Sequence, residues 1–273
     1  MPNMKDQDVT IRVLAAEAVA RQAGKVARRY YDDRINLAVE SKGVQDLVSI
    51  ADRAVEDLIV GTLGGAFPGD TFLGEEGGAT SEGNLTGDRL WVIDPIDGTA
   101  NFLRGIPHWA VSIAYMVAGE VEIGVAYDPM TDELYSARRG GGATCDGTPI
   151  RVSDCTQLDK AMVGIGFSYR RPPALHVEAV EKALSAHCEY RRTGGGTLGM
   201  TLVADGRLEG YWEPHINAWD VLAGYLILRE AGGWTNDFLA DDGLAKGNPI
   251  VACAPGIKDA LIDLIGVPDA DQS

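Results

Sequence analysis

The chain contains few cysteines, few basic residues and no long apolar run. Its four cysteines, Cys145, Cys155, Cys188 and Cys253, form no Cys-x-x-Cys pair, which argues against a zinc site or a disulfide framework. They indicate reduced thiols, and residues 1–8 contain no signal-peptide-like apolar segment, so we expect a cytoplasmic protein. No apolar run is long enough to span a bilayer, and we therefore expect no membrane partner.

Basic side chains are outnumbered, with 24 Lys and Arg against 40 Asp and Glu, and the formal net charge is −16. Because proteins bind phosphate backbones through Lys and Arg, this balance argues against nucleic acid as a direct partner. Most of the excess negative charge keeps the protein surface charged, so that copies of the protein repel one another. Bound cations could neutralise part of this charge. The four histidines lack ligand spacing, so we expect His108 to be structural and assign no role to His215.

The most informative stretch is Asp94-Pro95-Ile96-Asp97-Gly98-Thr99, which follows a short apolar run at 90–93 that predicts a buried strand. Pro95 restrains the exit from that strand, and Gly98 removes side-chain bulk where a ligand could approach. Two acids at a strand end, followed by a helix N-terminus near Thr99, suit a hard cation and a phosphate. A tight turn is the alternative interpretation, since Asp, Pro and Gly are common turn residues.

Two further segments place acids at the ends of predicted elements. Glu75 and Glu76 follow a short apolar strand at 71–74, and Asp220 opens an apolar helical run that continues to Leu228. A solvated loop and an N-cap are the respective alternatives. Unpaired carboxylates that converge would repel one another and resist ionising without a cation. Convergence at one metal site is therefore the interpretation we favour for Glu75, Asp94, Asp97 and Asp220.

Hydrophobic periodicity predicts helices at both ends of the chain and strands between them. A first helix is expected from residue 8 to about 30, and a second from about 47 to 63 that carries Asp52. Residues 71–152 read mainly as strands, including 110–117, 121–127 and 133–138. The second half predicts strands at 162–166, 210–212 and 250–252, and helices at 175–187, 197–204, 220–231 and 256–265.

Taken together, the segments resemble the inositol monophosphatase family of Mg²⁺-dependent, lithium-sensitive sugar phosphatases. The order and spacing agree from about residue 8 to about residue 265. The resemblance implies an α/β layered sandwich of the form α-β-α-β-α, and it implies a homodimer. It also implies lobes over 1–152 and 153–267. The tail at 268–273 is small, polar and acidic, so we expect it to be frayed. The matching pieces are Asp46 to Asp52, Gly74-Glu75-Glu76, Trp91 to Phe102, Trp219 to Gly224, and Glu230-Ala231-Gly232-Gly233.

The resemblance further implies two or three Mg²⁺ ions in each active site. Glu75, Asp94 and the main-chain carbonyl of Ile96 would hold the first ion. Asp94, Asp97 and Asp220 would hold the second, with Asp94 bridging the two. A third, weaker ion would bind near Glu75, and Li⁺ would compete at the second position.

The roles of the remaining site residues also come from the resemblance. Thr99 would help orient the attacking water and pass its proton toward Asp52, while Glu75 positions the nucleophile. The N–H groups of Gly98 and Thr99 would grip the phosphate. Attack would be direct and in line, with no phosphoenzyme.

Substrate contacts are expected from the Gly194-Gly195-Gly196 loop and from Glu213, beside Asp97 and Asp220. The three glycines also fit a flexible turn. Lys42 matches a mobile loop that closes over metal in relatives, and a solvated surface lysine is the alternative.

The sequence therefore predicts a Mg²⁺-dependent phosphomonoesterase that acts on a small polyol or sugar phosphate. Inositol 1-phosphate is the first candidate substrate. Histidinol phosphate and fructose 1,6-bisphosphate are alternatives, and a bisphosphonucleotide is less favoured because no base-binding segment is evident. A hypothesis of another class is a regulatory protein that binds the transcription machinery, as some bacterial members of the family do.

Overall fold

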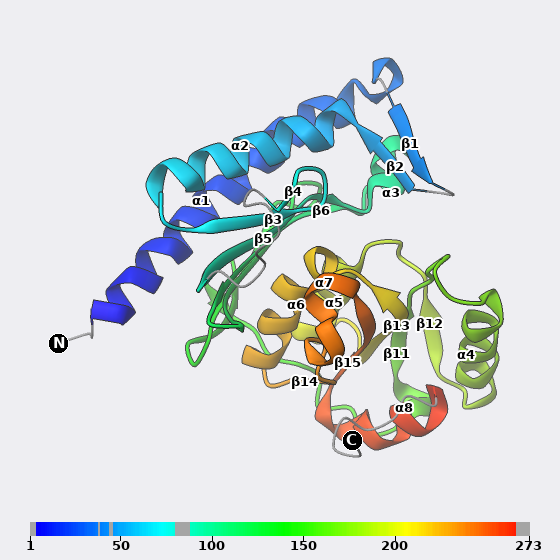
Figure 1. The fold of residues 1–273 in the computed structure, drawn as a ribbon. Coiled ribbons are helices and arrows are strands. Elements are labelled where there is room, and N and C mark those ends of the chain that lie inside the picture. The colour runs from blue at the N-terminus through cyan, green and yellow to red at the C-terminus, as the bar shows by residue number, and fades with distance from the viewer. Residues whose placement is uncertain (1–3, 38, 44–45, 80–87, 266–273) are drawn as a thin grey trace.

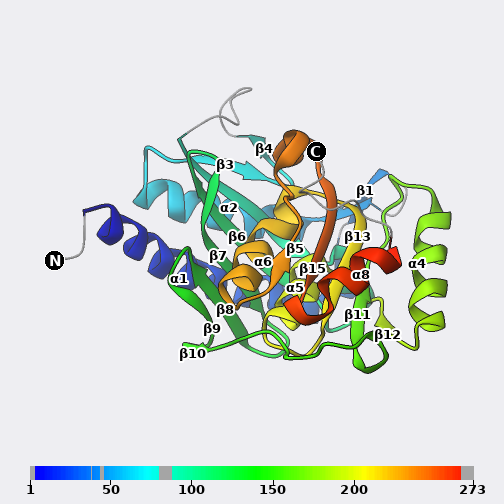
Figure 2. The same cartoon turned by 90° about the horizontal axis from the view of Figure 1, so that it is seen from below.

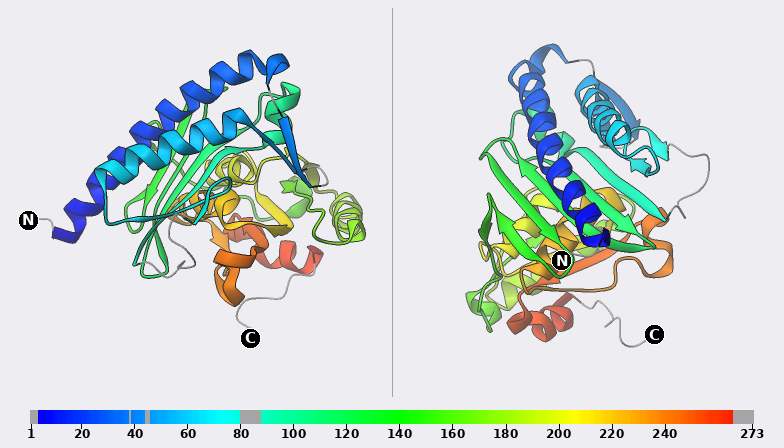
Figure 3. Two further views of the ribbon diagram at one scale, coloured as in Figure 1. Left: turned by 45° about the horizontal axis from the view of Figure 1, so that its top comes forward. Right: turned by 90° about the vertical axis from the view of Figure 1, so that its left-hand side faces the viewer.

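The computed structural model describes residues 4–37, 39–43, 46–79 and 88–265, and it is built from alternating layers of helices and sheets (Figure 1). The first layer consists of α1 (Met4–Asp32) and α2 (Ile50–Ala66), which lie side by side across one face of the larger sheet (Figure 3). Their apolar faces supply buried alanines, valines and isoleucines to that interface, among them Ala20, Ala23, Val55 and Ile59. Both helices thus pack by the amphipathic spacing that predicts them.

The larger sheet has eight strands in the order β10-β9-β8-β7-β6-β5-β3-β4. Neighbours are antiparallel except β3 and β5, which run parallel with Gly74 opposite Ile93. Because parallel strands present their carboxyl ends at the same edge, the segments that follow β3 and β5 meet there. The strands are β3 (Thr71–Gly74), β4 (Gly78–Ala79), β5 (Arg89–Asp97), β6 (Ala110–Val117), β7 (Glu120–Asp128), β8 (Glu133–Arg138), β9 (Gly142–Cys145) and β10 (Thr148–Pro149).

A central helical layer of α5 (Gly196–Ala204) and α6 (Ala218–Glu230) separates this sheet from a second one (Figure 1), and Figure 2 gives the view of the same layers from below. The second sheet has the order β12-β11-β13-β15-β14. Its far face is covered by α4 (Pro173–Ser185) and α8 (Lys258–Ile265). The predicted α-β-α-β-α sandwich is confirmed. The strands of the second sheet are β11 (Met162–Ile165), β12 (Glu189–Arg191), β13 (Gly210–Ile216), β14 (Trp234–Thr235) and β15 (Asn248–Cys253).

Shorter elements complete the described chain. A two-stranded sheet pairs β1 (Val39–Gly43) with β2 (Asp46–Ser49), and α3 (Thr99–Arg104) follows β5. The remaining pieces are η1 (Arg34–Asn36), η2 (Leu158–Lys160), η3 (Ala240–Asp242), α7 (Gly243–Lys246) and η4 (Pro255–Ile257). Within the described residues, no helix combines the length and apolar character needed to cross a membrane.

Three hydrophobic cores fill the spaces between the described layers. The central core is relevant to the predicted division into two lobes. That core joins Leu90 and Ala114 of the larger sheet with Met200 and Leu222 of the central helices. It therefore draws side chains from both sides of residue 152. The division into lobes 1–152 and 153–267 stays a prediction.

The observed elements differ from the predicted ones at three places near the site. The second helix begins at Ile50, so the prediction of helix at 47–49 is wrong, because these residues pair with β1. Strand β5 continues through Pro95 to Asp97 instead of ending at residue 93. Its register with β6 is irregular between Asp94 and Asp97, where Pro95 has no N–H to donate. Strand β13 likewise extends past Trp212 to Ile216.

Candidate active site

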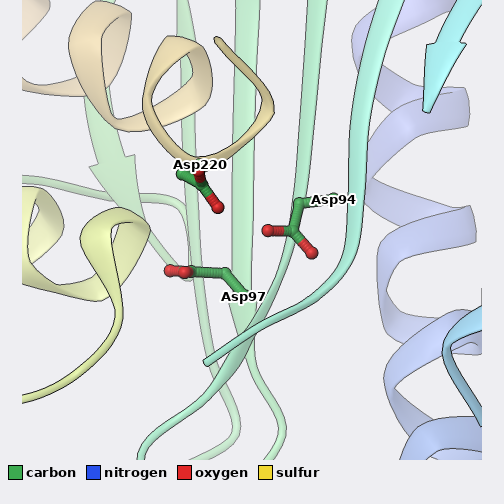
Figure 4. A group of neighbouring side chains, drawn as sticks. All are labelled: Asp94, Asp97 and Asp220. Atoms are coloured by element: carbon green, nitrogen blue, oxygen red, sulfur yellow. The ribbon is translucent and has the colours of Figure 1, made fainter. Parts of the chain in front are cut away.

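Three acids from two elements converge at the edge of the larger sheet. Asp94 and Asp97 lie on β5, and Asp220 lies in the first turn of α6 (Figure 4). Each offers a carboxylate oxygen, and these atoms all lie within 4.8 Å of one another. The structure thus brings together three of the four acids that the sequence places at converging ends, and we call them the acidic triad.

An irregularity in β5 lets both of its acids face the same side. Side chains three residues apart on a regular strand point to opposite faces. Here Asp94 pairs with Ser112 and Asp97 pairs with Ala110, so a step of three residues on β5 matches a step of two on β6. Such an insertion is a β-bulge, which re-aims side chains beside sites. Gly98 follows with φ +93°, where L side chains are strained.

Asp220 is held by the start of its own helix. It stands three residues after Asn217, and the Asn217 N–H donates to Asp220 Oδ2 at 3.1 Å in a capping box. The alternative that Asp220 is the N-cap is wrong, because Asn217 occupies that position. The same carboxylate also lies close to those of Asp94 and Asp97.

The electrostatics of the acidic triad favour an added cation. Burial raises the pKa of Asp94 well above its ordinary value, and the nearby carboxylates Glu75, Asp220 and Asp97 add to the effect. Burial and Asp220 raise the pKa of Asp97 to about 7, and burial raises the pKa of Asp220. In the part of the chain that the structure describes, none of the three forms a salt bridge.

The hydrogen bonds leave one buried oxygen of the acidic triad without a partner. Asp94 Oδ1 accepts the Ile96 N–H at 2.9 Å, but Asp94 Oδ2 is buried and accepts nothing. Asp97 accepts the N–H groups of Gly196 at 3.2 Å and Thr197 at 2.7 Å. A buried carboxylate oxygen without a hydrogen bond is costly. Oxygen-only ligands of this kind fit a hard divalent cation such as Mg²⁺.

Glu75 reaches the same edge from the parallel strand β3. Its N–H donates to the Ile93 carbonyl at 3.2 Å, one residue before Asp94, and its side chain lines the neighbouring cavity. The charge of Glu75 contributes to the raised pKa of Asp94. Glu75 therefore lies at the same edge of the sheet as the acidic triad.

Thr99 lies beside Asp52, its predicted partner, and beside the carbonyl of Ile96. Its hydroxyl is 3.0 Å from the Ile96 carbonyl oxygen and 3.3 Å from Asp52 Oδ1. Asp52 comes from α2 and is fully buried, so it is not the solvent-facing helix acid that its position alone suggests. A hydroxyl beside a buried carboxylate has a route for its proton.

A cavity of about 220 Å³ opens beside the acidic triad. The glycine loop forms one wall, and its glycines allow a close approach. A Cβ at Gly195 would lie 3.2 Å from Asp97 Oδ2, and one at Gly196 would lie 2.4 Å from Ile216 Cδ1. Besides the glycines, the wall includes Glu75, Asp97, Thr99, Ala100, Ile165, Phe167, Arg192, Thr193, Tyr211, Glu213, Ile216 and Asp220.

Glu213, for which we expect a substrate contact, lies in the cavity wall, and the sequence does not predict its partner Tyr211. The Tyr211 hydroxyl donates to Glu213 Oε2 at 2.5 Å. Burial raises the pKa of Glu213 to about 8, with Asp220 and Asp97 contributing. The group can therefore carry a proton near neutrality and donate as well as accept.

Three residues at the site were missed by the sequence reasoning. Asn101 donates from Nδ2 to the carbonyls of His108 at 2.9 Å and Thr193 at 2.8 Å, which ties α3 to the glycine loop. Arg192 and Phe167 line the cavity, with Arg192 Cζ 5.8 Å from the Phe167 ring centre. The only signal for Asn101 and Arg192 was position: Asn101 lies two residues after Thr99, and Arg192 lies two residues before Gly194.

Other predicted residues fall outside the cavity or outside the described part. His108 is half-buried, and burial lowers its pKa, in keeping with a structural role. His215 Nε2 lies 3.0 Å from the Lys246 carbonyl. Lys42 belongs to β1, but its side chain lies outside the described residues, so its loop role stays a prediction.

Comparisons with known proteins identify similar chains. A sequence model of the inositol monophosphatase family matches residues 9–264. The inositol-1-monophosphatase of Mesorhizobium japonicum is 39% identical over 251 residues, covering 91% of this chain and 94% of that protein. The Nus factor SuhB of Pasteurella multocida is 38% identical over 248 residues, covering 90% and 92%. The structure of extragenic suppressor protein suhB from Bartonella henselae superposes with a TM-score of 0.85, at 34% identity, covering 95% and 97%.

Proposed function

The chain belongs to the inositol monophosphatase family, and from this premise we propose that it is a Mg²⁺-dependent phosphomonoesterase acting on a small polyol phosphate. Inositol 1-phosphate is the first candidate. The observation that carries the proposal is the buried, unpartnered Asp94 Oδ2 inside the acidic triad. An acceptor in that position calls for a cation that the chain itself does not supply.

The ligands come from residues already at one edge of the sheet. Asp94, Asp97, Asp220, Glu75 and the carbonyl of Ile96 would hold two or three Mg²⁺ ions. When bound, the ions would neutralise the phosphate, activate water and stabilise the leaving oxygen. The carboxylates become the ionised ligands that the site needs, because a bound cation opposes the effect of burial on their pKa values.

The chain's own part in the reaction is to place the nucleophile and carry its proton. The Thr99 hydroxyl sits 3.3 Å from Asp52 Oδ1 and can pass a proton to this buried carboxylate. Glu75 faces the cavity and orients the attacking water. Attack is direct and in line, so no side chain is phosphorylated.

Substrate binding uses residues that line the same cavity. The N–H groups of Gly98 and Thr99 at the start of α3 hold phosphate oxygens. Asp97, Asp220, Glu213 and the backbone at Gly195 and Gly196 meet the hydroxyl groups of the substrate. Glu213 would meet a hydroxyl group of the polyol from the cavity wall.

The test is phosphate release from a panel of esters with Mg²⁺ and with EDTA. The panel contains inositol 1-phosphate, histidinol phosphate, fructose 1,6-bisphosphate and 3′-phosphoadenosine 5′-phosphate. We expect Mg²⁺-dependent turnover that favours inositol 1-phosphate. Preference for another ester would reassign the substrate, and no turnover of any ester would contradict the proposal. Li⁺ inhibition, a homodimer and a cytoplasmic location are expected on the same grounds.

A second candidate is a regulatory role at the transcription machinery, with secondary phosphatase activity. The observation that favours it is the name Nus factor carried by relatives such as the one from Pasteurella multocida. A partner protein could mediate such a role, which would leave the prediction of no direct nucleic-acid binding in place. A strain carrying only the Asp94→Asn variant separates the two candidates, since a regulatory phenotype that survives loss of hydrolysis requires binding.

A further inference from the structure

Helix α2 presents a second buried acid toward the site, one turn beyond Asp52. Glu56 is 5% exposed and Asp52 is 0% exposed, and residues four apart share one face of a helix. Asp52 reaches Thr99. Glu56 instead reaches the turn between β3 and β4, where it plays no part in the chemistry described so far.

The Glu56 carboxylate accepts two main-chain N–H groups from that turn. Oε2 accepts the N–H of Glu76 at 2.9 Å, and Oε1 accepts the N–H of Gly77 at 2.5 Å. Bonds from amides to an ionised acceptor are short and strong. The two bonds fix both residues that directly follow Glu75.

The glycines around Glu75 are explained by the same contact. A Cβ at Gly74 would lie 2.4 Å from Glu56 Oε2, and a Cβ at Gly77 would lie 2.6 Å from Glu56 Oε1. Neither glycine has a positive φ, so conformational freedom does not account for them. The lack of a side chain at Gly74 and Gly77 therefore leaves room for the Glu56 carboxylate of α2.

We propose that Glu56 is a positioning residue that holds the β3–β4 turn, so that Glu75 faces Asp94 and the cavity. The inference rests on the proposed function, in which Glu75 is a Mg²⁺ ligand. Through Asp52 and Glu56, a single face of α2 then positions Thr99 and Glu75 together. Groups that orient a ligand in this way commonly change metal affinity or activity by about 10- to 100-fold when altered.

A purely structural role for Glu56 makes a different prediction. Satisfying two amides would stabilise the fold, and losing them would lower the melting temperature without changing how the folded protein binds Mg²⁺. A positioning role changes the affinity of the folded protein itself. The two roles are therefore separated by a binding measurement at a temperature where every variant is folded.

The experiment compares Glu56→Gln with Asp57→Asn by calorimetric titration with Mg²⁺. Asp57 is the next residue on α2 and is exposed, so its variant makes the same charge change away from the turn. We expect Glu56→Gln to weaken Mg²⁺ binding by about 10-fold or more, and to raise the Mg²⁺ concentration for half-maximal phosphate release in parallel. Asp57→Asn should match the wild type.

Gly74→Ala tests the contact from its other side, because the added methyl group displaces the Glu56 carboxylate. It should weaken Mg²⁺ binding in the same direction. Hydrogen exchange of the wild-type protein in EDTA adds a measurement that needs no variant: the amides of Glu76 and Gly77 should be protected.

Unchanged Mg²⁺ affinity in folded Glu56→Gln and Gly74→Ala would overturn the inference, and so would unprotected amides at residues 76 and 77. A wild-type protein that binds no Mg²⁺ would instead contradict the proposed function. The two failures are thus distinguishable.

Discussion

Buried carboxylates lie near both ends of β5, but among the described residues the one near its start has a cationic side chain as a partner and the acidic triad has none. Near its start, Asp70 accepts Arg12 Nε at 2.9 Å, Arg12 Nη2 at 3.0 Å and Trp91 Nε1 at 3.0 Å. The Arg12 guanidinium also lies 4.3 Å from the Phe67 ring centre. This acid has a cation and a full set of donors, all supplied by the fold.

The acidic triad at the other end of β5 has three carboxylates and, within the described chain, no salt bridge. The Arg12–Asp70 pair shows that this fold can bury an acid with its own counter-ion. Where the counter-ion is missing, the pKa of Asp97 rises to about 7 and Asp94 Oδ2 stays unpartnered. Carboxylates are buried at both ends, so the lack of a counter-ion within the described chain distinguishes the end that needs an added cation.

The largest effect is expected from Asp94→Asn. The amide removes the proposed bridging ligand, and a lost electrostatic contact to the transition state costs about 10² to 10³ in kcat. Phosphate release in saturating Mg²⁺ should therefore fall by at least about 100-fold. Thermal stability in EDTA should hold or rise, because one repelling charge is gone. Wild-type activity in the variant would remove the acidic triad from the mechanism.

At the opposite end, Arg12→Met should reduce stability and spare the chemistry. Breaking a buried ion pair typically costs about 3–5 kcal/mol, because a charge is left unpaired. Arg89 Nη1 stands 4.0 Å from Asp70 Oδ1 and gives partial compensation, so we expect about 3 kcal/mol by urea denaturation. The specific activity of the folded fraction should equal that of the wild type. A stability loss well below about 1 kcal/mol would mean that this pair does not differ from surface pairs.

The pH dependence of stability should reveal the acidic triad when metal is removed. A carboxyl whose pKa rises on folding from 3.8 to about 7, as for Asp97, holds more protons in the folded state between these values. The free energy of unfolding in EDTA should therefore fall as pH rises from about 4 to about 7, by roughly 2–4 kcal/mol. Mg²⁺ at 100 times its Kd should restore about 2.7 kcal/mol at pH 7. Denaturation curves at a series of pH values, with and without Mg²⁺, measure both effects, and stability in EDTA that rose with pH would contradict the assignment.

A smaller effect is expected at Asn101, a neutral neighbour of the acidic triad. Asn101→Ala removes two hydrogen bonds to the carbonyls of His108 and Thr193. The loss should cost about 1–2 kcal/mol of stability. Slight displacement of the glycine loop should lower kcat/KM by about 10-fold, with little change in Mg²⁺ affinity. Weaker Mg²⁺ binding would show that the loop supports the acids as well as the substrate.

The sequence predicted elements best where hydrophobic periodicity is regular. Strands β6 and β8 have the predicted bounds. The first turn of the second helix was misplaced because residues 46–49 pair with β1, a contact that local pattern does not encode. The short strands β9, β10, β12 and β14 were missed for a related reason, since two to four residues carry too little periodicity.

The acids of the site could be predicted because each lies near the end of a strand or in the first turn of a helix, and glycine or proline stands close to those on the strands. Glu56 and Asn101 could not be predicted in this way. In sequence, each is an ordinary polar residue within a helix, and its role depends on a turn or loop 20 or more residues away. Such roles follow from packing between elements, which spacing along one element does not reveal.

The most direct test is a calorimetric titration of metal-stripped protein with Mg²⁺ near pH 7.5, using the wild type, Asp94→Asn and Arg12→Met. The account predicts saturable binding of at least two ions to the wild type and to Arg12→Met, and binding at least about 10-fold weaker to Asp94→Asn. Equal binding by the wild type and Asp94→Asn, or no saturable binding by the wild type, would contradict the claim that the unbalanced end of β5 is a divalent-cation site.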